Sequence, residues 1–222
     1  MPSSYRTDII QQTREYVLAH ANAGGIHGID HWDRVYENGQ NLITTEVKPL
    51  VVGLFAYLHD SCRINDGEDL GHGERAVDFI SSLRDTLLKD VSDEDIQLLK
   101  TACRLHTVTI STGDPTIDAC FDADRLDLWR VGITPDPTRL ATEKGKEIAR
   151  KTIYCSTAVF LILLFLASCV HRKGRCPAVL ASLIQRISGQ NRTINKTGLF
   201  RKKQAVNFTG SRLFRIFVWM II

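Results

Sequence analysis

Apolar residues recur every three or four positions through the first 150 residues, in segments separated by glycine, proline and small polar residues. This period is that of α-helices with one buried face, and few segments show the alternation expected of a strand. The sequence contains no internal repeat and no low-complexity segment. The pattern therefore predicts an all-α domain over residues 1–150.

The ends of the predicted helices are marked by residues with known end preferences. The first helix is expected to begin after Ser4 or Thr7 and to stop at Gly24 and Gly25. Ser and Thr side chains cap free N–H groups, and glycine accepts the left-handed turn that ends a helix. Pro49 begins a later helix, and the almost wholly apolar sequence that follows it places that helix in the core.

Two further helices have equally clear starts. Ser92 followed by Asp95 resembles a capping box, which would open the helix that leads to His106. Gly113 and Pro115 interrupt the pattern before the last helix of the predicted core.

Histidine and aspartate residues stand at helix ends and on apolar faces, where a polar residue needs a partner. His31 opens a face that continues through Val35 and Leu42, and His59 with Asp60 ends the apolar segment PLVVGLFAYLHD. The motifs HWDRV, LHDSCR, GHGE, RLHT and DADRLD supply the potential ligands His31, His59, Asp60, His72, His106 and Asp124. Imidazole and carboxylate together favour a divalent transition ion (Mn, Fe, Co, Ni or Zn), because Mg and Ca prefer oxygen ligands.

The charge of the chain changes abruptly near residue 150. Residues 1–150 contain 16 of the 28 Lys and Arg and all 25 Asp and Glu, a net charge of −9. Residues 151–222 contain the other 12 Lys and Arg and no acidic residue, a net charge of +12. An ordinary globular domain mixes both signs, so residues 151–222 are interpreted as an atypical apolar and basic C-terminal tail of doubtful origin.

Three interpretations of this tail stay open. Residues 153–170 are 18 uncharged residues, which reaches the lower limit of about 17 to 25 for a membrane-spanning helix. The basic residues could instead bind nucleic acid or an anionic membrane surface, although no specific nucleic-acid motif occurs. The composition most resembles a frame-shifted translation or another non-native fusion.

Cysteine usage bears on the cellular compartment. The six cysteines include no CxxC pair and are too sparse for a secreted disulfide scaffold. The N-terminus also has no apolar signal segment. A reducing cytoplasm is therefore the predicted setting, with membrane anchoring through residues 153–170 as the alternative.

The order of the ligand motifs, H…HD…H…H…D, resembles the signature of HD-domain metal-dependent phosphohydrolases and their phosphodiesterase relatives. HWDRV and DADRLD are close to the forms that these motifs take, and the resemblance covers residues 26 to about 140. It implies an HD-domain helical bundle. It also implies metal-dependent hydrolysis of a phosphate ester or nucleotide by a metal-activated water, with a phosphorylated small molecule or nucleotide as the partner.

The resemblance further implies a metal centre with one or two ions. The first divalent ion would be bound by His31, His59, Asp60 and Asp124. A second would lie between His72 and His106 and be bridged to the first through Asp60, which is therefore also a predicted catalytic residue. Many HD domains lack the two middle histidines and bind one ion, so His72 and His106 could instead be ordinary helix-end residues.

Basic residues near the motifs suit an anionic substrate, because guanidinium groups bind phosphate oxygens in a bidentate way. Arg63 and Arg130 are the predicted phosphate contacts, and Arg63 is also a predicted catalytic residue. His27, four residues before His31, is a candidate proton donor to the leaving group, with packing under Trp32 as the alternative.

Arg34 and Arg125 have a structural explanation beside the functional one. Each stands close in sequence to a ligand and could support a neighbouring carboxylate such as Asp30, Asp33 or Asp127.

A second class of function keeps the metal site without turnover. In that hypothesis the domain is a catalytically silent module that binds metal or nucleotide for regulation. Turnover of phosphate esters, with His59 and Asp60 variants as controls, distinguishes the two, and the metal motifs themselves do not specify the substrate.

Overall fold

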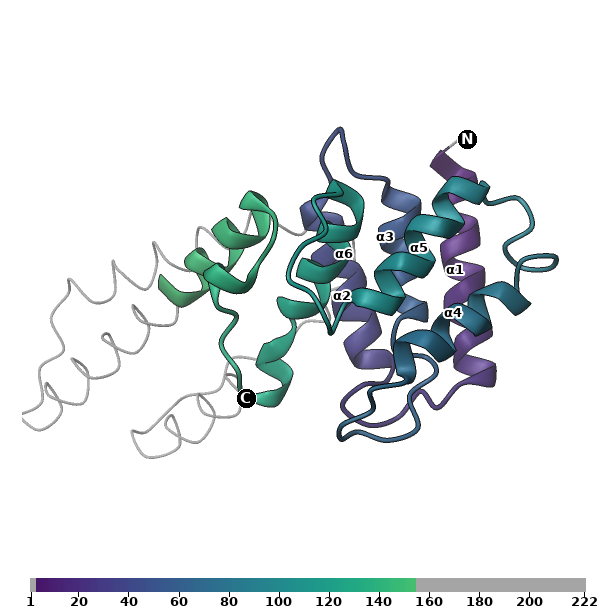
Figure 1. The fold of residues 1–222 in the computed structure, drawn as a ribbon, viewed down its shortest axis with the longest axis horizontal. Helices are drawn as coiled ribbons and strands as arrows, with labels where there is room; N and C mark the ends of the chain where they lie inside the picture. The colour runs from purple at the N-terminus through teal and green to yellow at the C-terminus, as the bar shows by residue number, and fades with distance from the viewer. Residues whose placement is uncertain (1–2, 155–222) are drawn as a thin grey trace, which may run out of the picture. The chain divides into compact units, whose positions relative to one another are not determined.

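The computed structural model describes residues 3–154, all within one compact unit of the chain, Met1–Leu164. These residues form helices and connecting loops without a strand, which confirms the all-α prediction (Figure 1). Residues 155–222, and with them most of the predicted membrane segment 153–170, lie outside the described residues. None of the helices within residues 3–154 is both long and apolar enough to span a bilayer.

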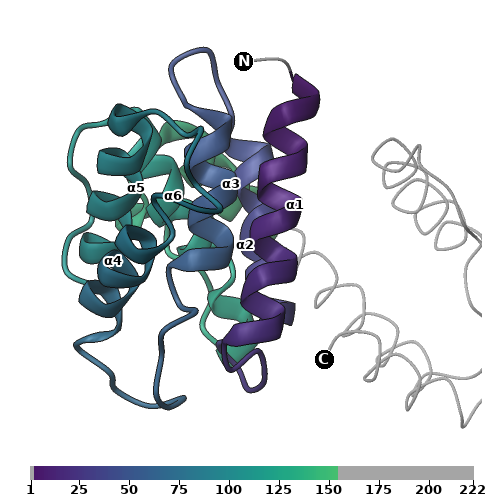
Figure 2. The same ribbon diagram turned by 90° about the vertical axis from the view of Figure 1, so that its right-hand side faces the viewer.

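The α-helices surround one buried member. They are α1 (Ser3–His20), α2 (Ile29–Leu42), α3 (Pro49–Leu58), α4 (His72–Ser82), α5 (Asp93–Leu105) and α6 (Pro115–Arg125). Two short 3-10 helices, Leu128–Val131 and Pro137–Arg139, follow, and residues 143–154 are again helical. α3 packs against α1, α2, α5 and α6, an arrangement that can be followed in Figures 1 and 2.

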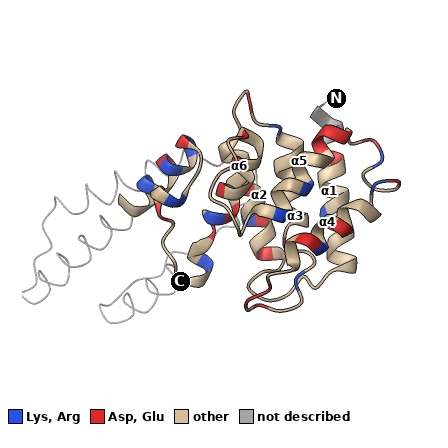
Figure 3. Cartoon of the chain, viewed as in Figure 1, with Lys and Arg blue, Asp and Glu red and all other residues tan. Residues whose placement is uncertain are grey.

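The central place of α3 follows from its sequence. Every residue from Leu50 to Leu58 is buried, and the helix carries no charged side chain. In Figure 3 the Lys, Arg, Asp and Glu residues lie on the other helices and on loops. A helix that is apolar all round is stable only inside the core, so its C-terminal end brings the next two residues, His59 and Asp60, into the interior.

Two predicted helix starts are confirmed by their caps. The Ser92 side chain accepts a hydrogen bond from the Asp95 N–H at the start of α5. At the start of α6, the Asp114 side chain accepts from two N–H groups of the first turn, and Pro115 occupies the first turn of the helix. Such caps satisfy N–H groups that have no partner within the helix.

The first helix ends earlier than predicted. α1 stops at His20, whose Nδ1 donates to the carbonyl of Tyr16 and so satisfies one of the last carbonyls of the helix. Gly25 does adopt the left-handed conformation, with φ of 76°, but in the loop that follows. The predicted helix end at Gly24 and Gly25 was therefore wrong by about one turn. The left-handed glycine is required by the loop and not by the end of the helix.

Candidate metal centre

The six predicted ligands lie close together, and each stands at or next to the end of a helix. His59 follows α3 and His106 follows α5, His72 opens α4, His31 lies in the first turn of α2, and Asp124 lies in the last turn of α6. The four histidines and Asp60 are 5% exposed or less, and the Asp124 side chain is 18% exposed. Polar side chains at this depth need partners, and here they face one another.

One group of ligand atoms gathers on His31. Its Nε2 lies 3.2 Å from His59 Nε2 and 3.4 Å from Asp124 Oδ1. Asp60 Oδ2 lies 3.7 Å from each of these two imidazole nitrogens. His59 Nε2 and Asp124 Oδ1 are 4.0 Å apart, so four donor atoms surround one point.

A second group gathers on the other oxygen of the same carboxylate. His72 Nε2 lies 3.0 Å from His106 Nε2, and Asp60 Oδ1 lies 3.3 Å from the first and 3.7 Å from the second. Asp60 Oδ1 is buried and has no hydrogen-bond partner among the described residues. Asp60 therefore presents one oxygen to each group.

The proton on each imidazole faces away from these groups. His59 Nδ1 donates to the carbonyl of Phe55, His106 Nδ1 to that of Cys103, and His72 Nδ1 to that of Asp69. Carbonyl oxygens only accept hydrogen bonds, so Nδ1 carries the proton. The Nε2 lone pairs consequently point at one another in pairs, an arrangement that is favourable only with a cation or an added proton between them.

The spacing of the donor atoms suits a divalent ion. Ligands bound at about 2.0–2.2 Å in tetrahedral or octahedral geometry lie roughly 3.0–3.6 Å apart, and the closest contacts in both groups have this separation. Three sets of residues have ligand atoms close enough together to hold a metal ion, namely His27–His31–Asp60, His31–His59–Asp124 and His59–Asp60–His106. The described residues thus contain a buried cluster of imidazoles and carboxylates able to bind metal.

The electrostatics favour the metal-binding state of His59, His72 and Asp60. Burial lowers the pKa of His59 to about 4 and also lowers the pKa of His72, so that both are neutral at neutral pH. For His31 and His106 burial has the same effect, but nearby carboxylates outweigh it and raise the pKa of both. Burial alone would raise the pKa of the Asp60 carboxyl, but the imidazoles of His59, His106 and His27 outweigh it and hold that pKa well below its usual value. A neutral imidazole and an ionised carboxylate are the forms that bind a metal.

A carboxylate that the sequence prediction did not place supports the centre. Asp127 is 5% exposed, and its Oδ2 accepts a 2.7 Å hydrogen bond from His31 Nδ1 while its Oδ1 accepts a 2.6 Å bond from Arg34 Nε. Asp127 stands three residues after Asp124, so both carboxylates lie on one side of the chain. This spacing in the sequence could have identified Asp127 as a partner of the ligands. The alternative explanation of Arg34, support of a carboxylate, is the one the structure shows.

Replacement of Asp127 by asparagine is expected to weaken binding of the ion held by His31 about 10-fold to 100-fold. An amide has one oxygen and one NH₂ group, so it cannot accept from both His31 and Arg34. Competition between the protein and a metal indicator for Mn²⁺ measures this change. The exposed Asp78, changed to asparagine, is the matched control, and equal affinities of the two variants would contradict a positioning role for Asp127.

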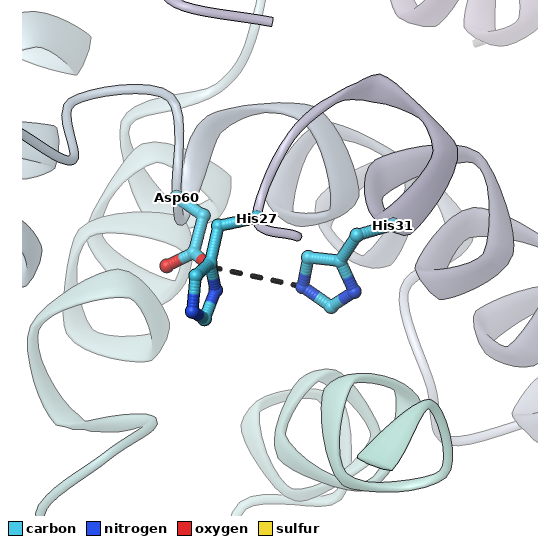
Figure 4. A group of neighbouring side chains, drawn as sticks. All are labelled: His27, His31 and Asp60. Carbon is cyan, nitrogen blue, oxygen red and sulfur yellow. Dashed lines mark hydrogen bonds and ion pairs between the residues drawn. The ribbon is translucent and has the colours of Figure 1, made fainter. Parts of the chain in front are cut away.

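His27 lies beside the carboxylate of Asp60. Its Nδ1 is 2.9 Å from Asp60 Oδ2, and Figure 4 shows the two side chains together with His31. Arg130 Nη2 lies 3.2 Å from the same nitrogen. The loop that carries His27 ends at Gly28, where a Cβ atom would lie 2.1 Å from a backbone carbonyl oxygen, so the close turn into α2 requires glycine.

The predicted phosphate-binding arginines occupy different surroundings. Arg63 Nη1 lies 3.6 Å from Asp60 Oδ1 and its Nη2 donates to the carbonyl of Gly67. Arg130 donates through Nε to the carbonyl of Ile26 and through Nη1 to that of Asp127. Both guanidinium groups therefore lie within reach of the centre, Arg63 directly and Arg130 through His27.

Arg125 supports a loop rather than a carboxylate. Its guanidinium donates to the carbonyls of Ile110, His106 and Thr109, and it lies 5.2 Å from the centroid of the Phe121 ring. These bonds hold the segment just after α5, which includes a ligand. The suggestion that Arg125 contacts Asp30, Asp33 or Asp127 was wrong, because carbonyl partners 15 to 19 residues away are closer.

The chain matches no protein-family model, no curated protein and no solved structure.

Proposed function

We propose that this chain is an HD-type metal-dependent phosphohydrolase that uses one or two divalent transition ions to hydrolyse a phosphate ester or nucleotide. The observation that carries the proposal is the division of the Asp60 carboxylate between two groups of ligand atoms. A carboxylate between two ions is the arrangement of a dinuclear centre. The H…HD…H…H…D order of the motifs supports the same assignment.

The ligands in this proposal are those brought together around Asp60. His31, His59, Asp60 and Asp124 would hold one ion, and His72, His106 and Asp60 the other. When bound, such ions polarise a phosphoryl group and lower the pKa of a water, so that it attacks at neutral pH. Mn, Fe, Co, Ni and Zn all suit this set of nitrogen and oxygen ligands.

The chain's own side chains would bind the substrate and transfer the proton. Arg63 is the better placed phosphate contact, because it is next to Asp60 and in the same small hollow as His27. In its protonated form His27 would donate the Nε2 proton to the leaving group, while its Nδ1–H stays bonded to Asp60 Oδ2 and holds the ring beside the centre. Arg130 would hold the loop of His27 through its hydrogen bond to the carbonyl of Ile26 and add positive charge near the phosphate.

The double replacement of His72 and His106 by alanine is expected to reduce the metal content from about two ions per chain to one. It removes two of the three ligands of one group and leaves the four ligands of the other. Elemental analysis of the purified full chain measures the content, beside turnover of a panel of phosphate esters. One ion in both proteins would contradict a dinuclear centre, and metal binding without turnover would favour the silent regulatory module.

The proposed setting is a reducing cytoplasm. Cys62, Cys103 and Cys120 are free thiols in the structure, and the latter two are buried in the core. This suits a compartment in which disulfides do not form.

A further inference from the structure

A cavity of about 650 Å³ lies against the metal centre. Its walls come from residues 106–110, which follow α5, and from segments within residues 124–140. Two predicted ligands, His106 and Asp124, belong to the wall. Its volume lies within the range of about 300–1,000 Å³ that is usual for sites that bind organic ligands.

Among the residues that line the cavity are three exposed apolar side chains. Val108, Ile110 and Ile133 line it and are 70%, 48% and 53% exposed. Single exposed apolar residues are ordinary, but a group of them around one concave site marks a binding surface. Since the metal ligands form part of the same wall, the bound molecule would be the one that reacts there.

The cavity also contains a cation that forms no ion pair with the described residues. Among its arginines, Arg125 is bonded to backbone carbonyls, whereas Arg139 is exposed and forms no ion pair with any residue in the described part of the chain. The nearby Asp136 carboxylate accepts hydrogen bonds from the N–H and the hydroxyl of Thr138. The hydrogen bonds from Thr138 are the main reason why the pKa of the Asp136 carboxyl is lowered, and the charge of Arg139 adds to this without an ion pair. The Arg139 guanidinium can therefore still pair with an anion.

A second hollow beside Asp60 has a different character. It has a volume of about 220 Å³ and is lined by polar groups that include His27, Asp60 and Arg63. It shares no lining residue with the larger cavity. Its volume is below the range of organic-ligand sites, so it suits a phosphate group or water rather than an organic group.

We propose that the larger cavity binds the organic part of the phosphate substrate, and that this part is apolar and carries a second negative charge paired with Arg139. The inference rests on the proposed function and specifies its substrate class. Val108, Ile110 and Ile133 contact the apolar group, while the phosphate reaches the metal ligands at His106 and Asp124. Ile133 and Arg139 are thus specificity-determining residues.

The test compares three phosphonates that cannot be hydrolysed, titrated calorimetrically into the Mn²⁺-loaded full chain at low salt. Methylphosphonate probes the metal centre alone, benzylphosphonate adds an apolar ring, and 4-carboxybenzylphosphonate adds the second charge. Benzylphosphonate is expected to bind at least about tenfold more tightly than methylphosphonate, because the ring leaves water. The carboxylate is expected to add roughly a threefold to tenfold increase.

Two variants of exposed residues, with a matched control, show which residue produces each gain in affinity. Ile133→Ser is expected to reduce the preference for the ring, and Arg139→Gln to remove the increment from the carboxylate. Arg150→Gln, an exposed arginine outside the cavity, is expected to change neither. All three should leave the metal content unchanged, and Arg150→Gln should also leave methylphosphonate binding unchanged.

The outcomes separate this inference from the proposed function. Equal binding of methylphosphonate and benzylphosphonate would overturn the cavity assignment alone. Equal binding of the two benzyl compounds, or an unchanged difference in Arg139→Gln, would overturn the role of Arg139. Failure of methylphosphonate to bind the metal-loaded chain would overturn the proposed function, and the cavity assignment with it.

Discussion

Replacing Asp60 with asparagine is expected to lower the turnover of phosphate esters by about a thousandfold or more and to remove at least one bound ion. The Asp60 carboxylate offers one oxygen to His31 and His59 and the other to the opposite histidine pair. Asparagine has the same shape, but its amide offers one oxygen and turns an NH₂ group toward the other ligands. It also removes the negative charge that balances the ions.

The matched control for this variant is Asp122→Asn. Asp122 is also fully buried, but its carboxylate accepts hydrogen bonds from the backbone N–H groups of Ala141 and Thr142. Its replacement is expected to lower the free energy of unfolding by about 1–3 kcal/mol and to leave the metal content unchanged. Metal analysis, circular dichroism and turnover measure both variants. An Asp60→Asn protein that keeps two ions and wild-type turnover would contradict the dinuclear assignment.

The helices could be predicted because local rules place them, whereas the meeting of the six ligands was predicted from the resemblance in the order of the motifs. The apolar face that begins at His31 continues through Val35 and Leu42, all buried in α2. The uninterrupted apolar sequence of α3 requires burial, so that whatever follows it, here His59 and Asp60, lies inside. The Ser92 cap likewise involves four consecutive residues and follows from hydrogen bonding within one turn.

The partners that support the ligands could not be predicted, because they depend on contacts between distant segments. Asp127 is 96 residues from His31, and the sequence offered Asp30 and Asp33 as equally plausible partners for Arg34. Asp33 instead binds Arg14 of α1 through two hydrogen bonds. Which carboxylate an arginine meets depends on how the helices pack, and periodicity within one helix does not determine it.

Replacement of Phe55 by alanine is expected to lower the free energy of unfolding by about 3–5 kcal/mol and to weaken metal binding. Phe55 is fully buried in α3. Its ring stacks on His59 with centroids 4.7 Å apart and meets the edge of His106 at 5.8 Å. The ring thus packs against one imidazole from each group of ligands, and its loss leaves a cavity into which both can turn.

The loss of stability expected for Phe55→Ala is large relative to the roughly 5–15 kcal/mol that stabilises a typical domain. Phe55→Leu therefore serves as a second variant, because leucine fills most of the space. It is expected to lower the free energy of unfolding by less than about 1.5 kcal/mol. The partly buried Phe79, changed to alanine, is the matched control, because it packs near Tyr16, outside the ligand groups. Urea unfolding in the presence of a chelator gives the stability of the metal-free protein, and Mn²⁺ titration gives the affinity. A change in affinity in Phe55→Leu but not in Phe79→Ala would trace to the packing of the ring against His59 and His106. Affinities unchanged in all three variants would show that the hydrogen bonds of His59 and His106 to backbone carbonyls alone orient the ligands.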